Sequence, residues 1–320
     1  MQSADLLSRA RQAAVFGRLA PYVLDPEVSD ILLSASRGLW LDRGGGLVAV
    51  PEMHFAEEEV RRRARALIDA GGRHLDEACP IADVELGEGV RVHAVLAPVA
   101  PGGTEISIRL PAMQAPGLAE LAERGMCGGE GGLGRLERMI AERRTFLISG
   151  ATGAGKTTLL AALLSGCGPA ERIVTIEDVS ELRIDHPHVV GLQARQSNIE
   201  GRGEVTMAEL VRHALRMRPD RLIAGECRGP ELPLFLSAFN TGHRGGGGTV
   251  HANSVADVPA RLEALGALAG IEPPLLARLV VGAFDDVLHV EQRAGIRQIT
   301  ARGRPYLSPD GQLGIVEEPW

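Results

Sequence analysis

The sequence predicts an α/β protein in which a smaller α+β domain precedes a mainly parallel sheet covered by helices on both faces. Three observations predict this class. From residue 145 onward, short apolar runs alternate with helical patterns, which is typical of parallel sheets. The first of these runs leads into a Gly-rich turn and a helix. Before residue 110, apolar and polar residues alternate in several short runs, which indicates a half-buried antiparallel sheet.

The composition is that of a globular protein large enough for two domains. The chain has 320 residues, 45% of them hydrophobic and 23% charged, and a net charge of −7. This acidic balance argues against a main role in gripping nucleic acid, so no direct nucleic acid binding is expected. The four cysteines form no C-x-x-C pair, which argues against a zinc site and favours reduced thiols. Without a signal segment or a membrane-spanning apolar run, we expect a cytoplasmic protein that reaches the membrane only through a partner.

The first domain is expected to span residues 1–110. Helices are predicted over residues 3–20 and 56–70. In the second helix, three glutamates at 57–59 lie four residues before three arginines at 61–63, which predicts ion pairs on a solvated face. Trp40 is expected to anchor the core. Strands are predicted over residues 28–33, 39–41, 47–50, 84–86, 90–96 and 105–109.

A linker region, residues 111–135, is expected to lead into the second domain, residues 136–320. A helix over 136–144 precedes the first strand of that domain. Thr206 and Glu209 form a capping box that opens a helix stopped by Pro219, while Pro230 and Gly242 bracket another. Strands are predicted over 145–149, 172–177, 189–193, 221–225 and 248–251. A last helix, ending near residue 284, is followed by short strands at 287–292, 296–300 and 314–316, which are expected to form an edge of the sheet.

Residues 150–157 match the pattern G-x-x-x-x-G-K-[ST] between a strand and a helix, the context that gives the pattern its meaning. The glycines let the N–H groups of the turn surround an anion, and the helix N-terminus adds about half a positive charge there. Lys156 is expected to lie against the β- and γ-phosphates, and the Thr157 hydroxyl to hold Mg²⁺. A chance match in a chain with 40 glycines is the alternative, but the flanking elements favour nucleotide binding. The residues predicted to bind ATP in this segment are Gly150, Ala151, Thr152, Gly153, Ala154, Gly155, Lys156, Thr157 and Thr158.

Three further polar clusters follow predicted strands, where their side chains would lie beside the phosphates. Glu177 and Asp178 are adjacent carboxylates suited to hold Mg²⁺ through water and to orient the attacking water, although such a pair is more often a helix cap or a solvated turn. Glu226 ends an apolar strand and is the candidate base, with an ion pair to Arg228 as the structural alternative. His251 follows a strand, among glycines that let backbone approach a phosphate, and is a candidate sensor of the γ-phosphate. His243 is a second candidate in the same stretch.

Hydrolysis also needs positive charge on the γ-phosphate in the transition state, and an arginine that supplies it is worth about 10³- to 10⁵-fold in rate. The sequence alone does not choose among the candidates, because most arginines are surface charges. An arginine supplied by a neighbouring subunit would make hydrolysis depend on a ring. The candidates are Arg91, Arg109, Arg195, Arg202, Arg212 and Arg216.

Four of these motifs, in this order, resemble those of the type II/type IV secretion ATPase superfamily. Residues 150–157, 175–182, 225–228 and 249–253 are similar to its Walker A motif, Asp box, Walker B motif and His box. Residues 198–206 and 210–221 are similar to the CpaF/TadA branch, which powers tight-adherence (Flp) pili and related conjugal-transfer systems. The likeness covers about residues 28–300.

The resemblance implies a RecA-like P-loop NTPase core, joined by a flexible linker to the N-terminal α+β domain, in a protomer that assembles as a hexamer. Nucleotide is expected between the two domains of one protomer, where Arg91 and Arg109 match family arginines that reach the phosphates. The catalytic residues that it implies are Lys156, Glu177, Glu226, Arg228 and His251, and the metal-binding residues are Thr157, Glu177 and Asp178.

The chain departs from the family pattern in several places. The glycine-serine loop before the His box is four glycines here, residues 245–248, which loses a hydroxyl and is expected to add flexibility. Leu110 stands where a basic residue is common, and Cys227 replaces a typical aliphatic residue. The tetracysteine zinc insert of the type II export and pilus-extension branch is absent from the sequence, which favours the CpaF/TadA branch.

The leading hypothesis is a motor ATPase at the inner face of the membrane, docked as a hexamer on an inner-membrane platform protein. It would couple hydrolysis of ATP, with Mg²⁺, to pilus assembly or retraction or to substrate transfer. One alternative is a nucleotide-gated regulatory or binding module with little turnover. The other is a P-loop kinase that phosphorylates a small molecule.

Overall fold

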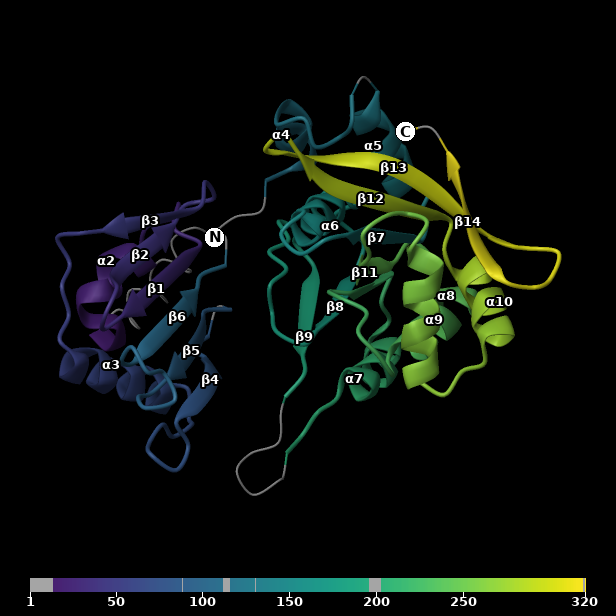
Figure 1. Ribbon diagram of the computed structural model, residues 1–320. Helices are drawn as coiled ribbons and strands as arrows, with labels where there is room; N and C mark the ends of the chain where they lie inside the picture. Colours follow the sequence, from purple (N-terminus) through teal and green to yellow (C-terminus); the bar gives the residue numbers. More distant parts are fainter. Residues whose placement is uncertain (1–13, 88, 112–115, 130, 196–202, 319) are drawn as a thin grey trace. The chain divides into compact units, whose positions relative to one another are not determined.

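The computed structural model describes residues 14–87, 89–111, 116–129, 131–195, 203–318 and 320, and it divides the chain into two compact units, Met1–Met113 and Gln114–Trp320 (Figure 1). Each unit has one sheet, with one apolar core in the first unit and two in the second, one on each face of its sheet. Part of the predicted first helix, the link at 112–115 and residues 196–202, which include Arg202 and part of the branch-specific motif, lie outside the described residues.

The first unit is an antiparallel sheet packed on one long helix. The six strands have the order β3-β2-β1-β6-β5-β4, and each neighbouring pair is antiparallel. Helix α3 (Glu57–Ala70) packs Val60, Ala64 and Leu67 into the core on one face of the sheet. The remaining elements are η1 (Gly17–Leu19), α2 (Ala20–Val23), β1 (Asp30–Ser34), β2 (Gly38–Asp42), β3 (Leu47–Val50), β4 (Ile81–Glu85), β5 (Arg91–Val95) and β6 (Glu105–Arg109).

Two predictions for this unit are wrong. Trp40 is exposed rather than in the core, because the alternation along β2 turns its two neighbours to the buried face. The acidic first turn of α3 does not pair within the helix as predicted. Glu57 accepts hydrogen bonds from the backbone N–H and the hydroxyl of Thr104, and Glu59 pairs with Arg18. These glutamates therefore tie the helix to the rest of the unit.

The second unit is a RecA-like core built on a mixed sheet of eight strands. The strand order is β14-β13-β12-β7-β11-β10-β8-β9. The pairs from β12 to β9 are parallel, whereas β13 and β14 are antiparallel additions at one edge. The strands are β7 (Phe146–Gly150), β8 (Ile173–Glu177), β9 (Val189–Gln193), β10 (Arg221–Ala224), β11 (Gly247–His251), β12 (Asp286–Arg293), β13 (Ile296–Leu307) and β14 (Leu313–Glu318).

Helices cover both faces of this sheet, as predicted (Figure 1). Helices α4 (Leu118–Glu123), α5 (Gly132–Ala141) and α6 (Lys156–Ser165) share an apolar core with Phe146 and Ile148 of β7. The other face carries α7 (Met207–Ala214), followed by η2 (Leu215–Met217), and α8 (Leu232–Asn240), α9 (Val258–Leu268) and α10 (Pro273–Ala283). Leu147 points to this second core, since successive residues of a strand face opposite ways. The predicted capping box of Thr206 and Glu209 is confirmed at the start of α7.

The predicted strands at 287–292, 296–300 and 314–316 correspond to β12, β13 and β14, which lie together at one end of the sheet as predicted, with β12 paired in parallel to β7. The structure corrects one prediction for the second unit. The four glycines at 245–248 do not form a flexible loop beside the phosphates. They are buried where β11 begins, at the end of β7 opposite Gly150. A Cβ on Gly247 would lie 2.3 Å from the carbonyl oxygen of Phe146, so glycine there allows close approach of two strands.

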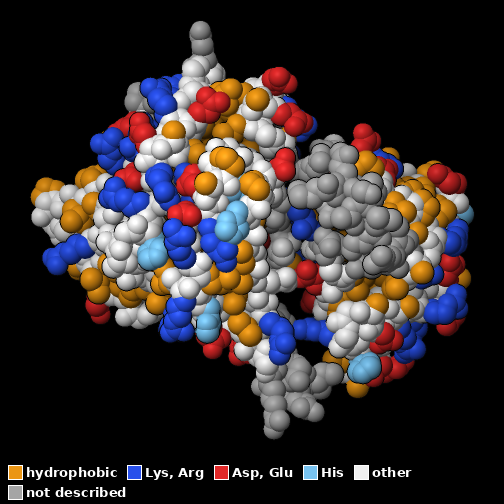
Figure 2. All heavy atoms as spheres, turned by 180° about the vertical axis from the view of Figure 1, so that it is seen from behind, with side chains coloured by type: hydrophobic (Ala, Val, Ile, Leu, Met, Phe, Trp, Pro, Cys, Tyr) orange, Lys and Arg blue, Asp and Glu red, His pale blue; other side chains and the backbone are white. Residues whose placement is uncertain are grey.

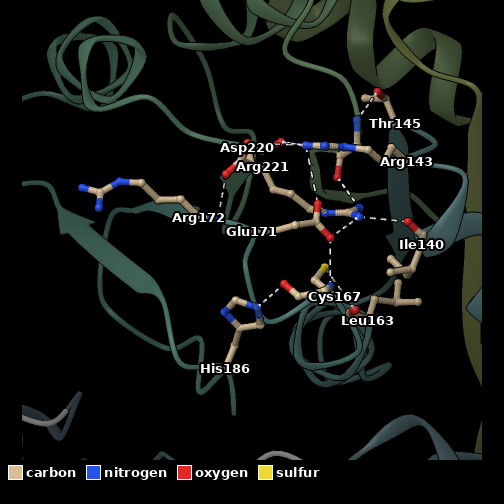
Figure 3. A network of polar contacts seen from close by, with 12 residues as sticks. Ile140, Arg143, Thr145, Leu163, Cys167, Glu171, Arg172, His186, Asp220 and Arg221 are labelled. Atoms are coloured by element: carbon tan, nitrogen blue, oxygen red, sulfur yellow. Dashed lines mark hydrogen bonds and ion pairs between the residues drawn. The ribbon is translucent and has the colours of Figure 1, made fainter.

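A partly buried ion pair joins the elements at this opposite end of the sheet (Figure 3). Arg221, at the start of β10, is 1% exposed and donates two hydrogen bonds to Glu171, at 2.8 and 3.1 Å. The same guanidinium donates to the carbonyl oxygens of Gly245 and Ile140. These bonds satisfy a charge that would be costly to bury unpaired, and they connect β10, β11 and α5.

The surface combines charges of both signs. In Figure 2, acidic and basic side chains intermingle over the face shown. The basic ones are arginines, because Lys156 is the only lysine of the chain and it is buried. Among the described helices, none is alone long and apolar enough to cross a membrane. Helices α9 and α10 meet that test only as a pair, with a bend of 118° between them.

Candidate functional site

The Gly-rich turn follows β7 near the middle of the sheet, and α6 begins directly after it. Gly150 has a φ of 154°, and a Cβ there would lie 2.3 Å from the carbonyl oxygen of Val290. Only glycine fits between β7 and β12 at this point. Ala151, Thr152 and Gly153 are exposed, at the N-terminus of α6, so an anion can reach the turn from solvent.

Lys156 is held beneath this turn. The side chain is 6% exposed, and Nζ donates hydrogen bonds to the carbonyl oxygens of Gly150, at 2.9 Å, and Ala151, at 2.8 Å. Nζ also lies 3.1 Å from Nδ1 of His251. Burial lowers the pKa of Lys156, and the carboxylate of Glu226 partly opposes that change.

His251, the last residue of β11, connects Lys156 to Glu226, which follows β10. Nε2 of His251 lies 3.1 Å from Oε1 of Glu226. Since Lys156 has only protons to offer, Nδ1 accepts and Nε2–H donates to the carboxylate. Burial and the charge of Lys156 lower the pKa of His251, which keeps the ring neutral.

Arg228 extends this connection to Asp178. Nη2 of Arg228 bonds to Oε2 of Glu226 at 2.9 Å, and Nη1 bonds to Oδ2 of Asp178 at 3.0 Å. Burial alone would raise the pKa of Glu226, but Arg228, His251 and Lys156 outweigh it and lower the pKa. Glu226 is therefore an ionised carboxylate, as a base or a water-orienting group must be.

Glu177, at the end of β8, is buried and directed into its own turn. Oε1 accepts hydrogen bonds from the backbone N–H groups of Glu181 and Leu182, both at 2.9 Å. Burial raises the pKa of Glu177, and these two bonds oppose the increase. The structure shows Glu177 bracing the segment after β8, and its role toward a metal ion stays a prediction.

The remaining predicted residues lie in three places. Thr157 and Thr158 are in the first turn of α6, partly buried. Arg91 and Arg109 belong to the first unit, where they lie directly opposite one another on β5 and β6, and Nε of Arg109 bonds to Asp30 at 3.1 Å. His243 precedes β11, at the end opposite His251, so it is not part of the site.

The structure adds Arg297, which sequence reasoning missed. It lies near the start of β13, and its Nε donates to the carbonyl oxygen of Gly153 at 2.9 Å. The two residues are 144 positions apart, and no motif marks Arg297. The pairing of β12 with β7, and of β13 with β12, brings it to the turn.

Comparison with protein families decides the assignment. The model of the type II/IV secretion system protein family matches residues 13–284. The chain belongs to that family. Members of this family are ATPases, so ATP hydrolysis is the activity of this enzyme.

The relatives in this family include proteins of several secretion and transfer systems. A putative conjugal transfer protein of Mycobacterium tuberculosis is 47% identical over 291 residues, covering 88% of this chain and 82% of that protein. The type IV secretion system protein PtlH of Bordetella pertussis is 33% identical over 321 residues, covering 89% and 92%.

Solved structures share the fold of this family member. The Legionella pneumophila ATPase DotB is 20% identical with a TM-score of 0.61, covering 94% of this chain and 79% of that chain. The pilus retraction motor PilT, solved with bound ADP, is 19% identical with a TM-score of 0.60, covering 94% and 81%. At this identity the likeness concerns the fold alone.

Proposed function

We propose that this chain is the ATP-hydrolysing motor of a Tad (Flp) pilus or conjugal-transfer machine. The observation that carries the proposal is the series of contacts from Lys156 through His251 to Glu226. It stands at the carboxyl ends of three adjacent strands, β7, β11 and β10. This arrangement brings a cation that can contact a phosphate and an ionised carboxylate to the same end of the sheet, at the carboxyl ends of its strands. Attack of water on a phosphoryl group requires both groups.

The residues of the turn fit a triphosphate. Exposed backbone at 151–153 and the N-terminus of α6 favour negative charge, and Nζ of Lys156 can exchange its contact with His251 for a phosphate oxygen while it keeps Gly150. Glu226 would then orient the attacking water and take its proton, with Arg228 holding the carboxylate ionised and in place.

Magnesium fits this site as an ion bound with the nucleotide. Among the residues that the structure describes, no group of three or more His, Cys, Asp or Glu side chains is arranged to hold a metal ion by itself. The Thr157 hydroxyl, in the first turn of α6, would hold the ion together with phosphate oxygens and water, and Glu177 and Asp178 would act through water. The ion would neutralise charge that develops on the phosphates.

The assembly is part of the same proposal. The conjugal-transfer relative supports a role in a transfer machine. The resemblance to the CpaF/TadA branch implies a homohexamer that docks on an inner-membrane platform protein at the cytoplasmic face of the membrane. Arg91 and Arg109 are proposed to supply cations to the phosphates of bound ATP, since two neighbouring guanidinium groups on one face of a sheet suit an anion. Closure of the N-terminal domain around ATP would be the mechanical stroke.

Phosphate release by the full chain tests the site. Lys156→Ala and Glu226→Gln are each expected to reduce turnover by about 10²- to 10⁴-fold. The first removes the ammonium group that would contact the phosphates, and the second removes the ionised base. Glu226→Gln is expected to keep its affinity for a non-hydrolysable ATP analogue. Glu137→Gln, which removes an exposed carboxylate from α5, is the matched control and should hydrolyse like the wild type.

The same preparations separate the alternatives. Mass photometry with and without nucleotide is expected to show a hexamer, whereas a small-molecule kinase would be a monomer or dimer that transfers phosphate to an acceptor. A wild-type protein that binds ATP tightly without measurable phosphate release would be a nucleotide-gated module. Near wild-type turnover in either site variant would contradict the site assignment.

A further inference from the structure

The arrangement of the strands indicates where the nucleoside end of a bound nucleotide lies. Glu226 and His251, which would face the γ-phosphate, follow β10 and β11 on one side of β7. A triphosphate gripped by the turn after β7 must therefore run toward the other side of that strand. On that side stand β12 and the hairpin that joins it to β13, above α6 and next to α4 (Figure 1).

Arg297 is the side chain that this hairpin places on the turn. Nε donates to the carbonyl oxygen of Gly153, and the stem passes over Gly155, where an added Cβ would lie 3.1 Å from Cδ of Arg297. Met126 contacts the same position, with its Cε 2.8 Å from the Cβ built on Gly155. A hydrogen bond from the N–H of Ile299 to the carbonyl oxygen of Met126, at 2.9 Å, fixes the start of β13 against this segment.

This setting leaves the guanidinium of Arg297 available to a ligand. Arg297 is exposed, whereas Met126, which contacts the same position, is 3% exposed. One face of the arginine side chain therefore packs on the protein, and the other face is open to solvent. Its two terminal amino groups make no hydrogen bond to the part of the chain that the structure describes. A planar cation with one edge already bonded is suited to stacking on an aromatic base.

We propose that Arg297 stacks on the base of the bound nucleotide and forms the nucleoside side of the site. This inference rests on the proposed function, because it requires a triphosphate in the turn after β7. Arg297 acts here in binding, not in the chemical step. The contact is expected to tolerate different bases, since every base presents a π-face.

The test compares two ligands that share phosphates and differ in the nucleoside. Affinities for a non-hydrolysable ATP analogue and for inorganic tripolyphosphate, both with Mg²⁺, are measured by calorimetry on the full chain. Arg297→Ala is expected to weaken binding of the ATP analogue by about five- to thirtyfold and to leave tripolyphosphate unchanged. Arg297→Lys, which keeps the charge without the plane, should lose a similar factor.

Arg293→Ala is the matched control, because it removes an exposed arginine of the same hairpin that pairs with Glu291. It should bind both ligands like the wild type, and thermal unfolding of all variants should match. Equal loss for both ligands in Arg297→Ala would overturn the proposal in favour of a role in holding the turn, and so would no loss for either. A wild-type chain that binds neither ligand would overturn the proposed function itself, which is a distinguishable result.

Discussion

Nδ1 of His251 lies 3.1 Å from Nζ of Lys156, although 95 positions separate the two residues. In this arrangement the histidine takes a hydrogen bond that a phosphate oxygen would otherwise receive. Under the proposed function, we expect a bound triphosphate to replace this contact, so that His251 is released when Lys156 engages a phosphate oxygen. This pair of residues would then couple occupancy of the turn to the group beside Glu226.

Removal of His251 is expected to separate binding from turnover. In His251→Ala we expect kcat to fall by about 10²-fold, because a group positioned beside the γ-phosphate is lost, without weaker affinity for the ATP analogue. Steady-state kinetics and calorimetry measure the two quantities. His243→Ala serves as control, since it removes a histidine at the other end of β11. An affinity loss as large as the loss in kcat would contradict the proposed exchange.

The lowered pKa of His251 predicts a stability change on acidification. The pKa is lowered from 6.5 by burial and by Lys156, so the folded state favours the neutral ring. The stabilisation from this preference is fully present above pH 6.5 and is lost as the pH falls through the lowered pKa. The Tm advantage of wild type over His251→Gln should therefore shrink as the pH falls from about 7.5 to about 5. A constant difference across that range would exclude titration of His251 as the cause.

Lys156 offers a chemical readout, because it is the only lysine of the chain. Burial lowers its pKa, so its amine becomes neutral and nucleophilic at lower pH than an ordinary lysine with a pKa of about 10.4. Acylation by a small amine-directed reagent, followed by peptide mass spectrometry, should show this lower midpoint. Nucleotide with Mg²⁺ should suppress the reaction at Lys156 while the α-amino group still reacts. Equal labelling with and without nucleotide would contradict occupancy of the turn.

The ion pair of Arg221 and Glu171 is expected to stabilise the core at the end of the sheet away from the site. Arg221→Met should lower the free energy of unfolding by about 1–3 kcal/mol, because it removes two hydrogen bonds from Glu171, which keeps Arg143 at 3.5 Å, and takes the side-chain donor from the Gly245 carbonyl oxygen. Denaturant titration measures the change, and Arg278→Met on the exposed side of α10 is the control. Adding Glu171→Met to Arg221→Met should recover part of the loss. A cost below 1 kcal/mol would show that the pair is dispensable.

Local sequence patterns predict most elements of the second unit. Apolar runs between helical patterns predict β7 to β11 within about one residue, and the capping box of Thr206 and Glu209 marks the start of α7, whereas α9 was not predicted. Trp40 was misplaced because a strand pattern does not say which face is covered. The sequence does not distinguish a loop from a strand at 245–248, because glycine is typical both of turns and of close strand approach.

The sequence by itself determined the P-loop, the order of strands and helices along the chain and the identity of Glu226 and His251 as candidates. These depend on residue types at short spacing, where local backbone preference decides. Only the tertiary structure decided that His251 joins Lys156 to Glu226, that Glu177 turns toward its own backbone, and that Arg297 lies over the turn. These contacts depend on which strands become neighbours, and strand order follows from the burial of the whole sheet rather than from any short stretch of residues.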